Sequence, residues 1–191
     1  MNRLLCIKAC VRICARLAGL CALCIALVPG VVAAAEPSEY TVKAAFIYNF
    51  AKFVEWPPEV SAKEGPFVIG ILGDDPFEGA LEEIISGKTI RDKKIIVKRF
   101  SKIEEAMGSH ILFISNSEKG NISRIIKQLA GTHVLTVSDI AEFAEKGGII
   151  ELILEQNHVR FAVNVAMAEQ GGLKPSSQLL KLARIVTKAK E

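Results

Sequence analysis

From residue 67 to residue 148 the sequence alternates short, continuously apolar runs with segments of helical periodicity. The apolar runs cover 67–72, 95–100, 111–115 and 134–137, and the helical patterns cover 77–85, 101–107, 121–130 and 139–145. Strands that are apolar on both faces need cover on both sides, and a parallel sheet with helices on each face provides it. The alternation therefore predicts an α/β fold, a three-layer αβα sandwich with a mainly parallel sheet.

The segment before this alternation has the pattern of an amphipathic helix. Ser38 is a suitable N-cap and Trp56-Pro57-Pro58 ends the pattern, so a helix is predicted over 39–54. By helical spacing its recurring face consists of Val42, Ala45, Phe46, Asn49, Phe50 and Phe53.

After a double glycine the pattern changes to a β-hairpin and a last helix. Two apolar runs around the turn Gln156-Asn157-His158 predict a hairpin over 149–163, and residues 165–170 suit a helical turn. Ser176 is placed to cap a final helix. The residues of that helix expected to face the core are Leu179, Leu180, Leu182, Ala183 and Val186.

Residues 1–35 have the order of a secretory signal peptide. A basic segment comes first, an uninterrupted apolar run over 17–28 follows, and Ala33 with Ala35 forms a small-residue cleavage pattern. We expect cleavage after Ala35, which leaves residues 36–191 as a single α/β domain. The alternative is an uncleaved anchor, because residues 17–35 are barely long enough to span a bilayer.

All five cysteines lie within the expected signal peptide, so the exported chain would contain none. Such a chain can form no disulfide, no thiolate metal site and no cysteine nucleophile. Its stability must then come from its core, and about 156 residues are enough to build one.

The charge balance argues against nucleic acid as a partner. Four of the 24 Lys and Arg lie in residues 1–35, which leaves 20 bases against 21 acids in the rest of the chain. A nearly neutral body lacks the basic surface that nucleic-acid-binding proteins use.

The sequence shows no pattern typical of a catalytic or metal centre. His110 and His133 precede predicted strands and His158 lies in the hairpin turn, without the spacing of metal ligands. Nucleophile-elbow, Walker and dinucleotide-binding motifs are also missing from the sequence. We therefore expect no catalytic residue, no metal and no cofactor; an exported hydrolase would need a nucleophile–base pair at one edge of the sheet.

Small polar side chains follow three of the predicted strands. In a doubly wound sheet, ligands bind at the carboxyl ends of the strands, where loops and helix N-termini meet. The candidate ligand-binding residues at this edge are Asp74, Asp75, Ser115, Asn116, Ser117 and Ser138. The same residue types form turns and cap helices, so a purely structural role is the alternative.

Aromatic residues are concentrated in the predicted N-terminal helix. Six of the 12 Phe, Tyr and Trp residues lie between positions 40 and 56, interleaved with polar residues. They either anchor the helix on the sheet or present part of an aromatic face to a protein partner, where Trp and Tyr commonly act as anchors.

Several blocks of the chain, in order, are similar to the YfiR family of exported proteins. These blocks are EYTVKAAFIYNFAKFVEWP (39–57), ILGDDPF (71–77), HILFIS (110–115), LTVSD (135–139), GGII (147–150) and SSQLLKLARIV (176–186). The resemblance covers nearly all of residues 38–186, which makes it far more specific than a single motif.

The resemblance implies a periplasmic regulator without catalytic activity. The family's namesake represses a membrane-bound diguanylate cyclase by acting on its periplasmic part, which lowers cyclic-di-GMP and biofilm formation. An outer-membrane lipoprotein relieves that repression, family members are associated with homodimers, and related domains occur with histidine kinases. The chain departs from the family at Ser109, where cysteine is frequent, so redox control is not carried over.

Two functional hypotheses follow. In the first, the chain represses a membrane-bound diguanylate cyclase or acts on a sensor kinase by protein contact. Its contact residues would be Tyr48, Lys52, Trp56, Gln178, Lys181 and Arg184. In the second, it is a periplasmic sensor of a small solute or nucleotide that acts on a histidine kinase, and the polar loops at the carboxyl edge form its binding site.

Overall fold

The structure is a computed structural model that describes residues 37–187, so the expected signal peptide and its cleavage after Ala35 lie outside the described residues. The helices are α2 (Glu39–Phe53), α3 (Pro58–Ser61), α4 (Ala80–Ile85), α5 (Ile103–Ala106), α6 (Ile122–Leu129), α7 (Val165–Gln170) and α8 (Ser177–Leu180), with a 3-10 helix, η2, over Asn116–Asn121. The strands are β1 (Val54–Glu55), β2 (Phe67–Leu72), β3 (Thr89–Ile90), β4 (Lys93–Phe100), β5 (Ile111–Ile114), β6 (Leu135–Ser138), β7 (Ile150–Glu155), β8 (His158–Asn164), β9 (Lys174–Pro175) and β10 (Arg184–Val186). No helix within the described range is long and apolar enough to cross a membrane.

The α/β class predicted from the alternation is confirmed. Eight strands form one sheet in the order β10-β8-β7-β6-β5-β2-β4-β3, and β1 pairs with β9 in a small separate sheet. The sheet is mixed rather than mainly parallel as expected, because β7 pairs with β8, and β3 with β4, in antiparallel fashion. Short two-residue turns make these antiparallel pairs possible, whereas the central strands need helical crossovers.

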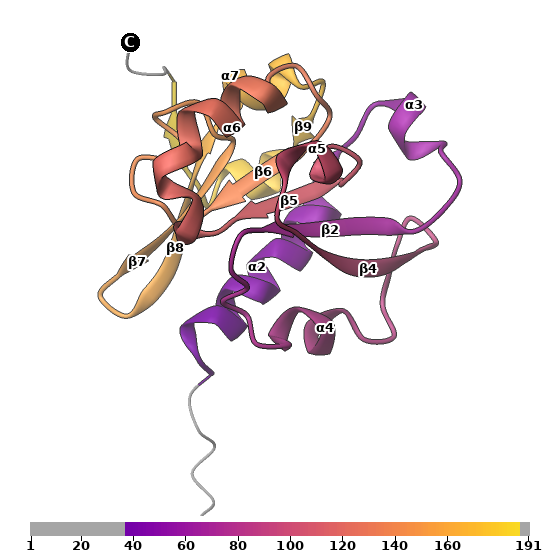
Figure 1. Cartoon of the computed structure of the whole chain (residues 1–191), viewed down its shortest axis with the longest axis horizontal. Coiled ribbons are helices and arrows are strands. Elements are labelled where there is room, and N and C mark those ends of the chain that lie inside the picture. Colours follow the sequence, from indigo (N-terminus) through magenta and orange to yellow (C-terminus); the bar gives the residue numbers. More distant parts are fainter. Residues whose placement is uncertain (1–36, 188–191) are drawn as a thin grey trace, which may run out of the picture. The chain divides into compact units, whose positions relative to one another are not determined.

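Both faces of the sheet are covered, as the continuously apolar strands require. Helices α2 and α4 lie on one side of β2 and β4, and α5 and α6 lie on the other side (Figure 1). Alternate residues of β5 enter the two cores: Ile111 and Phe113 pack toward α2, and Leu112 and Ile114 pack toward α6. The apolar runs therefore reflect burial on two sides, not a single amphipathic face.

Two tight hairpins flank the parallel strands. Gln156 and Asn157 link β7 to β8 with φ angles of 49° and 63°, and Arg91 and Asp92 link β3 to β4 with 48° and 63°. Positive φ at both central residues is typical of type I′ turns, whose twist matches that of the strands. The first hairpin was expected from the sequence; the second was missed because β3 has only two residues.

The helix predicted over 139–145 does not form. Residues 141–147 make turns instead, and Glu142 has a φ of 62°, which interrupts a right-handed helix. The carboxylate of Glu151, on β7, accepts hydrogen bonds from the backbone N–H groups of Glu142 and Ala144 at 3.1 and 3.2 Å. The Glu151 carboxylate thus binds two backbone N–H groups that would bond to backbone carbonyls in the predicted helix.

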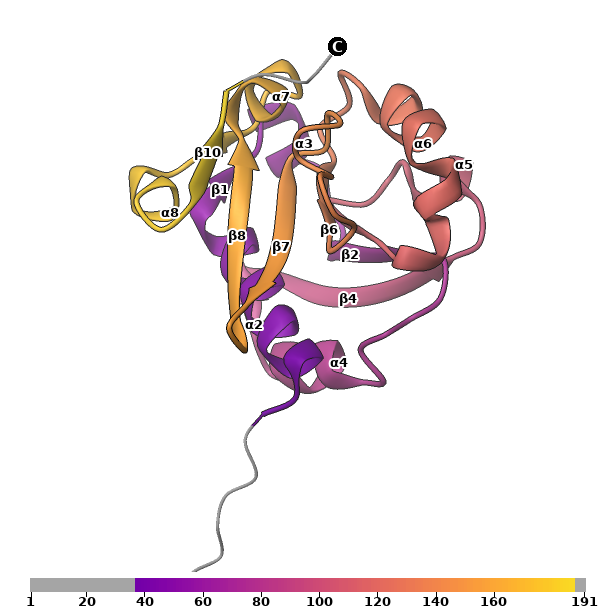
Figure 2. The same cartoon turned by 90° about the vertical axis from the view of Figure 1, so that its left-hand side faces the viewer.

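The last helix is also much shorter than predicted. Ser176 caps it as expected, because its hydroxyl accepts a hydrogen bond from the N–H of Leu179, but the helix ends at Leu180. The chain then enters β10, which pairs in parallel with β8 at the edge of the sheet (Figure 2). Leu182, expected in the core, is 77 % exposed as a result.

Candidate partner interface

Helix α2 packs on the sheet through a stripe different from the one predicted. Its buried apolar residues are Ala44, Ile47, Phe50 and Ala51, of which only Phe50 belongs to the expected face. Phe46 and Phe53 are only partly buried, and Asn49 is exposed. The helix is therefore apolar on two sides, and the second side, with Phe46 and Phe53, is only partly covered by the sheet.

This second side borders a groove between α2, β8 and α8, which we call the α2–α8 groove. It has a volume of about 300 Å³ and is lined by Phe46, Asn49, Phe50, Phe53, Phe161, Gln178, Leu179 and Leu182. Tilted and edge-on ring contacts shape its floor, since the Phe161 centroid lies 5.6 Å from that of Phe46 and 5.2 Å from that of Phe50. An apolar groove with an exposed leucine at its border is a surface of the kind that protein partners cover.

The edge strand that follows α8 also exposes an apolar residue. Ile185 in β10 is 43 % exposed, and β10 has a neighbouring strand on one side only, within residues 37–187. An edge strand with an exposed apolar residue offers both backbone hydrogen bonds and apolar contact to another chain. Leu182, which lines the groove, and the edge strand β10 thus follow α8 within a few residues of each other.

The predicted contact residues fall into three groups. Gln178 lines the groove, while Lys181 and Arg184 are exposed beyond the end of α8 rather than on a helix face. Lys52 is exposed, and Tyr48 is half-buried with the ammonium of Lys88 4.7 Å from its ring centroid. These five side chains are accessible to a partner.

Trp56, the sixth predicted contact residue, is covered. Its side chain is 6 % exposed, and its indole N–H donates a hydrogen bond of 3.1 Å to the carbonyl oxygen of His133. The ring packs edge-on against Phe67 at 5.2 Å. Trp56 therefore joins the end of α2 to the sheet and presents little surface to solvent.

The residues that the sequence analysis missed are Phe46 and Phe53 as groove residues, together with Leu182 and Ile185. The two phenylalanines were placed on the predicted face of the helix, which was expected either to anchor the helix on the sheet or to meet a partner. The sequence of α2 could have predicted a second contact face, because residues 44, 47 and 51 form a second apolar stripe at helical spacing. Two such stripes on one helix indicate a second apolar contact.

The polar residues predicted as a ligand site, here called the carboxyl-edge cluster, do gather at one edge of the sheet. Their hydrogen bonds are made within the chain. Ser138 is fully buried, donates to the Ile114 carbonyl at 2.7 Å and accepts from the Ile140 N–H at 3.1 Å. Asp75 accepts from the Phe77 N–H at 2.8 Å and pairs with Arg99 at 2.5 Å.

The serines of the neighbouring loop are used in the same way. Ser115 accepts a hydrogen bond from the N–H of Ser117, whose own hydroxyl accepts from the N–H of Asp74 at 3.0 Å. A Cβ atom at Gly73, where φ is +87°, would lie 2.3 Å from the Ser117 hydroxyl. The loops are thus closely packed, and only the side chains of Asp74 and Asn116 extend to solvent without a role in this network.

A buried ion pair fastens the start of α2 to the same edge. Lys43, whose side chain is 4 % exposed, contacts Asp139 at 2.6 Å and Glu39 at 2.5 Å. The hydroxyl of Tyr40 donates to the same Asp139 carboxylate at 3.0 Å. Burial and the Asp139 charge raise the pKa of Tyr40. Burial alone would lower the pKa of Lys43, but its hydrogen bonds to Asp139 and Glu39 raise it overall.

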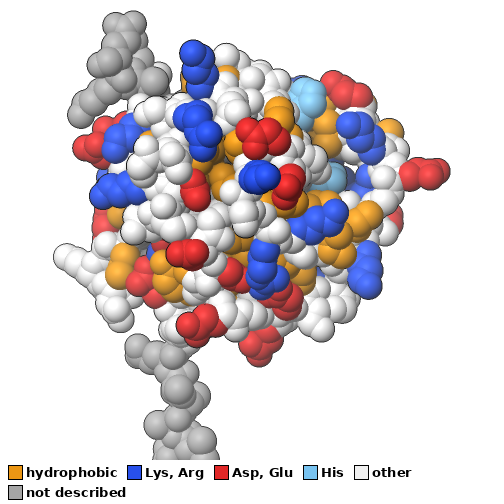
Figure 3. Space-filling view, in the orientation of Figure 1, with side chains coloured by type: hydrophobic (Ala, Val, Ile, Leu, Met, Phe, Trp, Pro, Cys, Tyr) orange, Lys and Arg blue, Asp and Glu red, His pale blue; other side chains and the backbone are white. Residues whose placement is uncertain are grey.

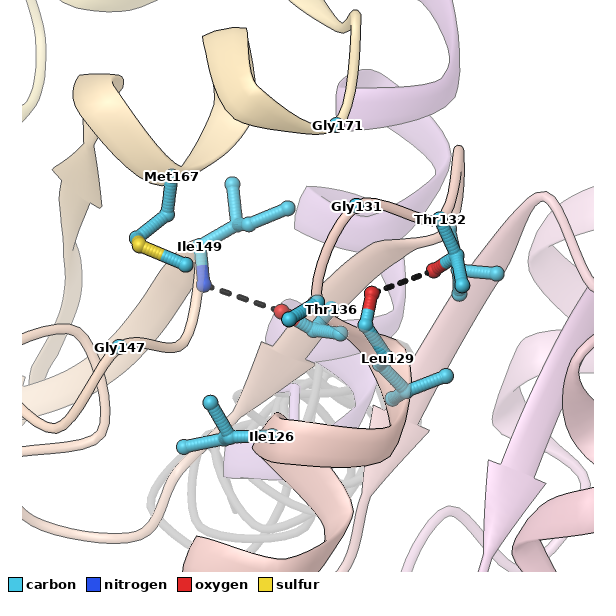
Figure 4. A pocket seen from close by; sticks show the side chains of 11 residues that line it. Ile126, Leu129, Gly131, Thr132, Thr136, Gly147, Ile149, Met167 and Gly171 are labelled. Atoms are coloured by element: carbon cyan, nitrogen blue, oxygen red, sulfur yellow. Dashed lines mark hydrogen bonds between the residues drawn. The ribbon is translucent and has the colours of Figure 1, made fainter.

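A further cavity lies between α6 and α7, and it is small. Its volume is about 20 Å³, close to that of one water molecule. Figure 4 shows Met167 from α7 and Ile126 from α6 at its border. The hydroxyl of Thr136 accepts from the Ile149 N–H at 3.0 Å, and that of Thr132 donates to the Leu129 carbonyl at 2.6 Å. This cavity is a packing defect rather than a ligand site.

The three histidines are separated in the structure as in the sequence. His110 and His133 lie at the amino ends of β5 and β6, and His158 lies at the turn of the β7–β8 hairpin. Within residues 37–187, His, Asp and Glu form no group of three that could hold a metal ion.

The fold and the groove define an α/β domain with an apolar groove at its surface that suits a protein partner. The chain belongs to the YfiR/HmsC-like family, because the model of that family matches residues 40–184. Members of this family are periplasmic regulators that act with membrane signalling proteins in diguanylate cyclase signalling.

A solved structure supports the fold independently. The chain is similar to a conserved domain protein from Vibrio cholerae, with a TM-score of 0.50 and 14 % sequence identity. The match covers 78 % of this chain and 60 % of that one, so it spans less than two thirds of the solved chain. No curated protein sequence matches the chain significantly.

Proposed function

We propose that the chain is exported to the periplasm and represses a membrane-bound diguanylate cyclase by contacting the periplasmic domain of that enzyme. The α2–α8 groove is the contact surface, and the chain itself carries out no catalytic step. The observation that carries the proposal is this uncovered apolar groove in a member of the YfiR/HmsC-like family. By this account repression lowers cyclic-di-GMP and limits biofilm formation.

The chemistry of the groove indicates what the partner must present. Apolar and aromatic side chains at the centre of an interface supply most of the binding free energy, and the polar border supplies orientation. Exposed cations lie next to lining residues in the sequence, because Lys52 precedes Phe53, and Lys181 and Arg184 lie on either side of Leu182. We therefore expect an apolar segment of the cyclase, flanked by carboxylates, to occupy the groove.

Relief of repression and formation of a homodimer can use this surface and the neighbouring edge strand. An outer-membrane lipoprotein that binds the α2–α8 groove would compete with the cyclase and so relieve repression. The exposed edge strand β10 is suited to pairing with a second copy of the chain, which agrees with the proposed homodimer. The mass of the purified exported protein in solution tests that assembly.

Cyclic-di-GMP in living cells tests the proposal. Deletion of the gene should raise cyclic-di-GMP, and the wild-type gene on a plasmid should reverse the rise. Leu182→Glu places a charge at the border of the groove and should fail to reverse it, whereas Leu154→Glu should succeed. Leu154 is a matched control because it is 49 % exposed, lies in β7 and does not line the groove.

Two outcomes would contradict the proposal. Unchanged cyclic-di-GMP after deletion would remove the cyclase as the target and place a histidine kinase first. Normal repression by the Leu182→Glu variant would show that contact is made elsewhere on the surface.

A further inference from the structure

The amino ends of the strands form an open cavity of their own, which we call the amino-edge cavity. It has a volume of about 300 Å³ and is lined by Val60, Lys63, Met107, Gly108, Ser109, His110, Thr132, His133 and Val134. In Figure 3, histidine, lysine and apolar side chains surround a hollow below α3. A volume near 300 Å³ is at the lower end of the range found for small-molecule sites.

His110 is held in one orientation and one tautomer at the wall of this cavity. Its ring stacks on Phe67 with centroids 4.4 Å apart, and its Nδ1 accepts a hydrogen bond of 3.1 Å from the N–H of Val68. Because Nδ1 is an acceptor, the neutral ring carries its proton on Nε2. The Nε2–H group has no hydrogen-bond acceptor within residues 37–187 and remains available as a donor.

The charges that act on His110 are positive. Burial of the imidazole, with the nearby ammonium groups of Lys93 and Lys63, lowers the pKa of His110 to about 4. Lys93 donates a hydrogen bond to the backbone carbonyl of Lys63, which keeps the two lysine residues close together. The ammonium of Lys63 forms no ion pair in the part of the chain that the structure describes.

The other ionisable side chains near the cavity, Arg91 and His133, already make hydrogen bonds within the chain. Arg91 donates hydrogen bonds to the Ser61 hydroxyl at 2.9 Å and the Val54 carbonyl at 3.3 Å. His133 pairs through Nδ1 with the Gly171 carbonyl at 2.8 Å, and its Nε2 lies 3.9 Å from the carboxylate of Glu59. A ligand in the cavity therefore meets one unpaired cation, the neutral His110 donor and the Ser109 hydroxyl, which has no hydrogen-bond partner among the described residues.

We infer that the amino-edge cavity binds a small organic carboxylate with an apolar body. The carboxylate would accept hydrogen bonds from the Lys63 ammonium and the His110 Nε2–H group, in the field of Lys93. The apolar body would lie against Val60, Met107 and Val134. This site is separate from the α2–α8 groove, with which it shares no lining residue.

The donor set favours a carboxylate over a phosphate. A carboxylate has two oxygens, which one ammonium and one imidazole N–H can satisfy, whereas a phosphate group has more oxygens and a larger charge. The apolar wall also suits an organic acid better than an inorganic anion. Benzoate is a suitable probe because it joins one carboxylate to an apolar ring, and benzamide is its neutral counterpart.

Nitrogen and proton NMR of the His110 ring tests the inference on the protein exported from its full-length gene. Benzoate should shift the His110 signals in a saturable way, and benzamide should bind at least about ten-fold more weakly because it lacks the charge. Lys63→Met should weaken benzoate binding by about ten-fold, which corresponds to the loss of one charge-assisted hydrogen bond.

Lys119→Met is the matched control, because Lys119 is an exposed lysine in η2, at the opposite edge of the sheet. Its variant should bind benzoate as the wild type does. The inference is overturned if benzoate and benzamide bind alike, or if the Lys63 and Lys119 variants do not differ. It is also overturned if the His110 signals show no saturable shift up to about 10 mM benzoate. These readouts do not depend on signalling by the chain.

Discussion

The carboxyl-edge cluster and the α2–α8 groove differ in whether their chemical groups are already used. At the carboxyl edge, Ser138 and Asp75 make their hydrogen bonds to the chain itself. In the groove, Phe46 and Phe53 are only partly covered and Leu182 is 77 % exposed. The residue types alone favoured both regions as sites. At the carboxyl edge only the side chains of Asp74 and Asn116 are left without a role, whereas the groove leaves an apolar surface partly uncovered.

We infer from this difference that the carboxyl-edge cluster stabilises the fold and that the α2–α8 groove binds a partner. Buried polar groups that are hydrogen-bonded within the chain hold the loops and α2 in place, and removing one partner leaves another unpaired. Exposed apolar groups add little to the folded state but gain free energy when a partner covers them. Substitutions in the two regions should therefore have opposite effects on folding and on signalling.

Lys43→Met should give the largest loss of stability. It would leave the buried carboxylate of Asp139 without its cation, and breaking a buried pair in this way costs about 3 kcal/mol. Urea unfolding of the purified protein measures the change in the free energy of unfolding. The Lys43→Met/Asp139→Asn double variant should recover part of the loss. A loss below about 1 kcal/mol would show that the pair contributes little.

Ser138→Ala should be next, with a loss of about 2 kcal/mol. The change leaves the Ile140 N–H without its acceptor in a fully buried position. Ser117→Ala is the matched comparison at the same edge, because its hydroxyl also accepts from a backbone N–H but is exposed to solvent. It should cost less than about 0.5 kcal/mol. Equal losses in the two variants would contradict the argument from burial.

Alkaline pH should weaken the same edge by a smaller amount than either buried substitution. The pKa values of Lys43 and Tyr40 are raised above 10.5 and 10.0, so both groups hold their protons more tightly in the folded state. The unfolded chain loses these protons first, and stability therefore falls as pH rises above about 10. Urea unfolding at a series of pH values should show a steeper fall in the wild type than in the Lys43→Met variant. Parallel curves would exclude a contribution from this ion pair.

Leu182→Glu should have the smallest effect on folding. Its side chain is mostly exposed, so the free energy of unfolding should change by no more than about 0.5 kcal/mol. The same variant should lose repression, whereas the Ser117→Ala variant should keep it. The contrast between the groove and the carboxyl-edge cluster is wrong if Leu182→Glu unfolds the protein or if Ser117→Ala abolishes signalling.

The sequence predicted best the elements whose signals are local. The run 67–72 is a strand with the expected bounds, because a continuously apolar run can be covered only inside the fold. Ser38 caps α2 as predicted, since its hydroxyl accepts from the N–H of Thr41 at 3.2 Å. These features depend on a few neighbouring residues and not on the rest of the chain.

The missed elements depend on distant partners. Residues 139–145 have a helical pattern, but Glu151 from a later strand takes two of their N–H groups. Residues 184–186 continue a helical pattern too, yet they pair with β8 and become an edge strand. Tertiary hydrogen bonds decided the outcome in both places, and local periodicity contains no information about them.

The candidate site was predictable in part for the same reason. The aromatic content of α2 pointed to a contact surface, but helical spacing could not tell which of its two apolar stripes would face the sheet. Gln178, predicted as a contact residue, lines the groove. Leu182 was assigned to the core because the final helix was predicted to be longer than it is. The burial of Trp56 could be seen only once its hydrogen bond to the His133 carbonyl was known.

Photocrosslinking in growing cells tests the central claim most directly. A photoreactive amino acid would replace Leu182 in the groove in one strain and Leu154 on the β7–β8 hairpin in another. The account predicts that position 182, and not position 154, crosslinks to a membrane-bound diguanylate cyclase identified by mass spectrometry. Equal crosslinking from both positions, or no cyclase among the products at position 182, would contradict it.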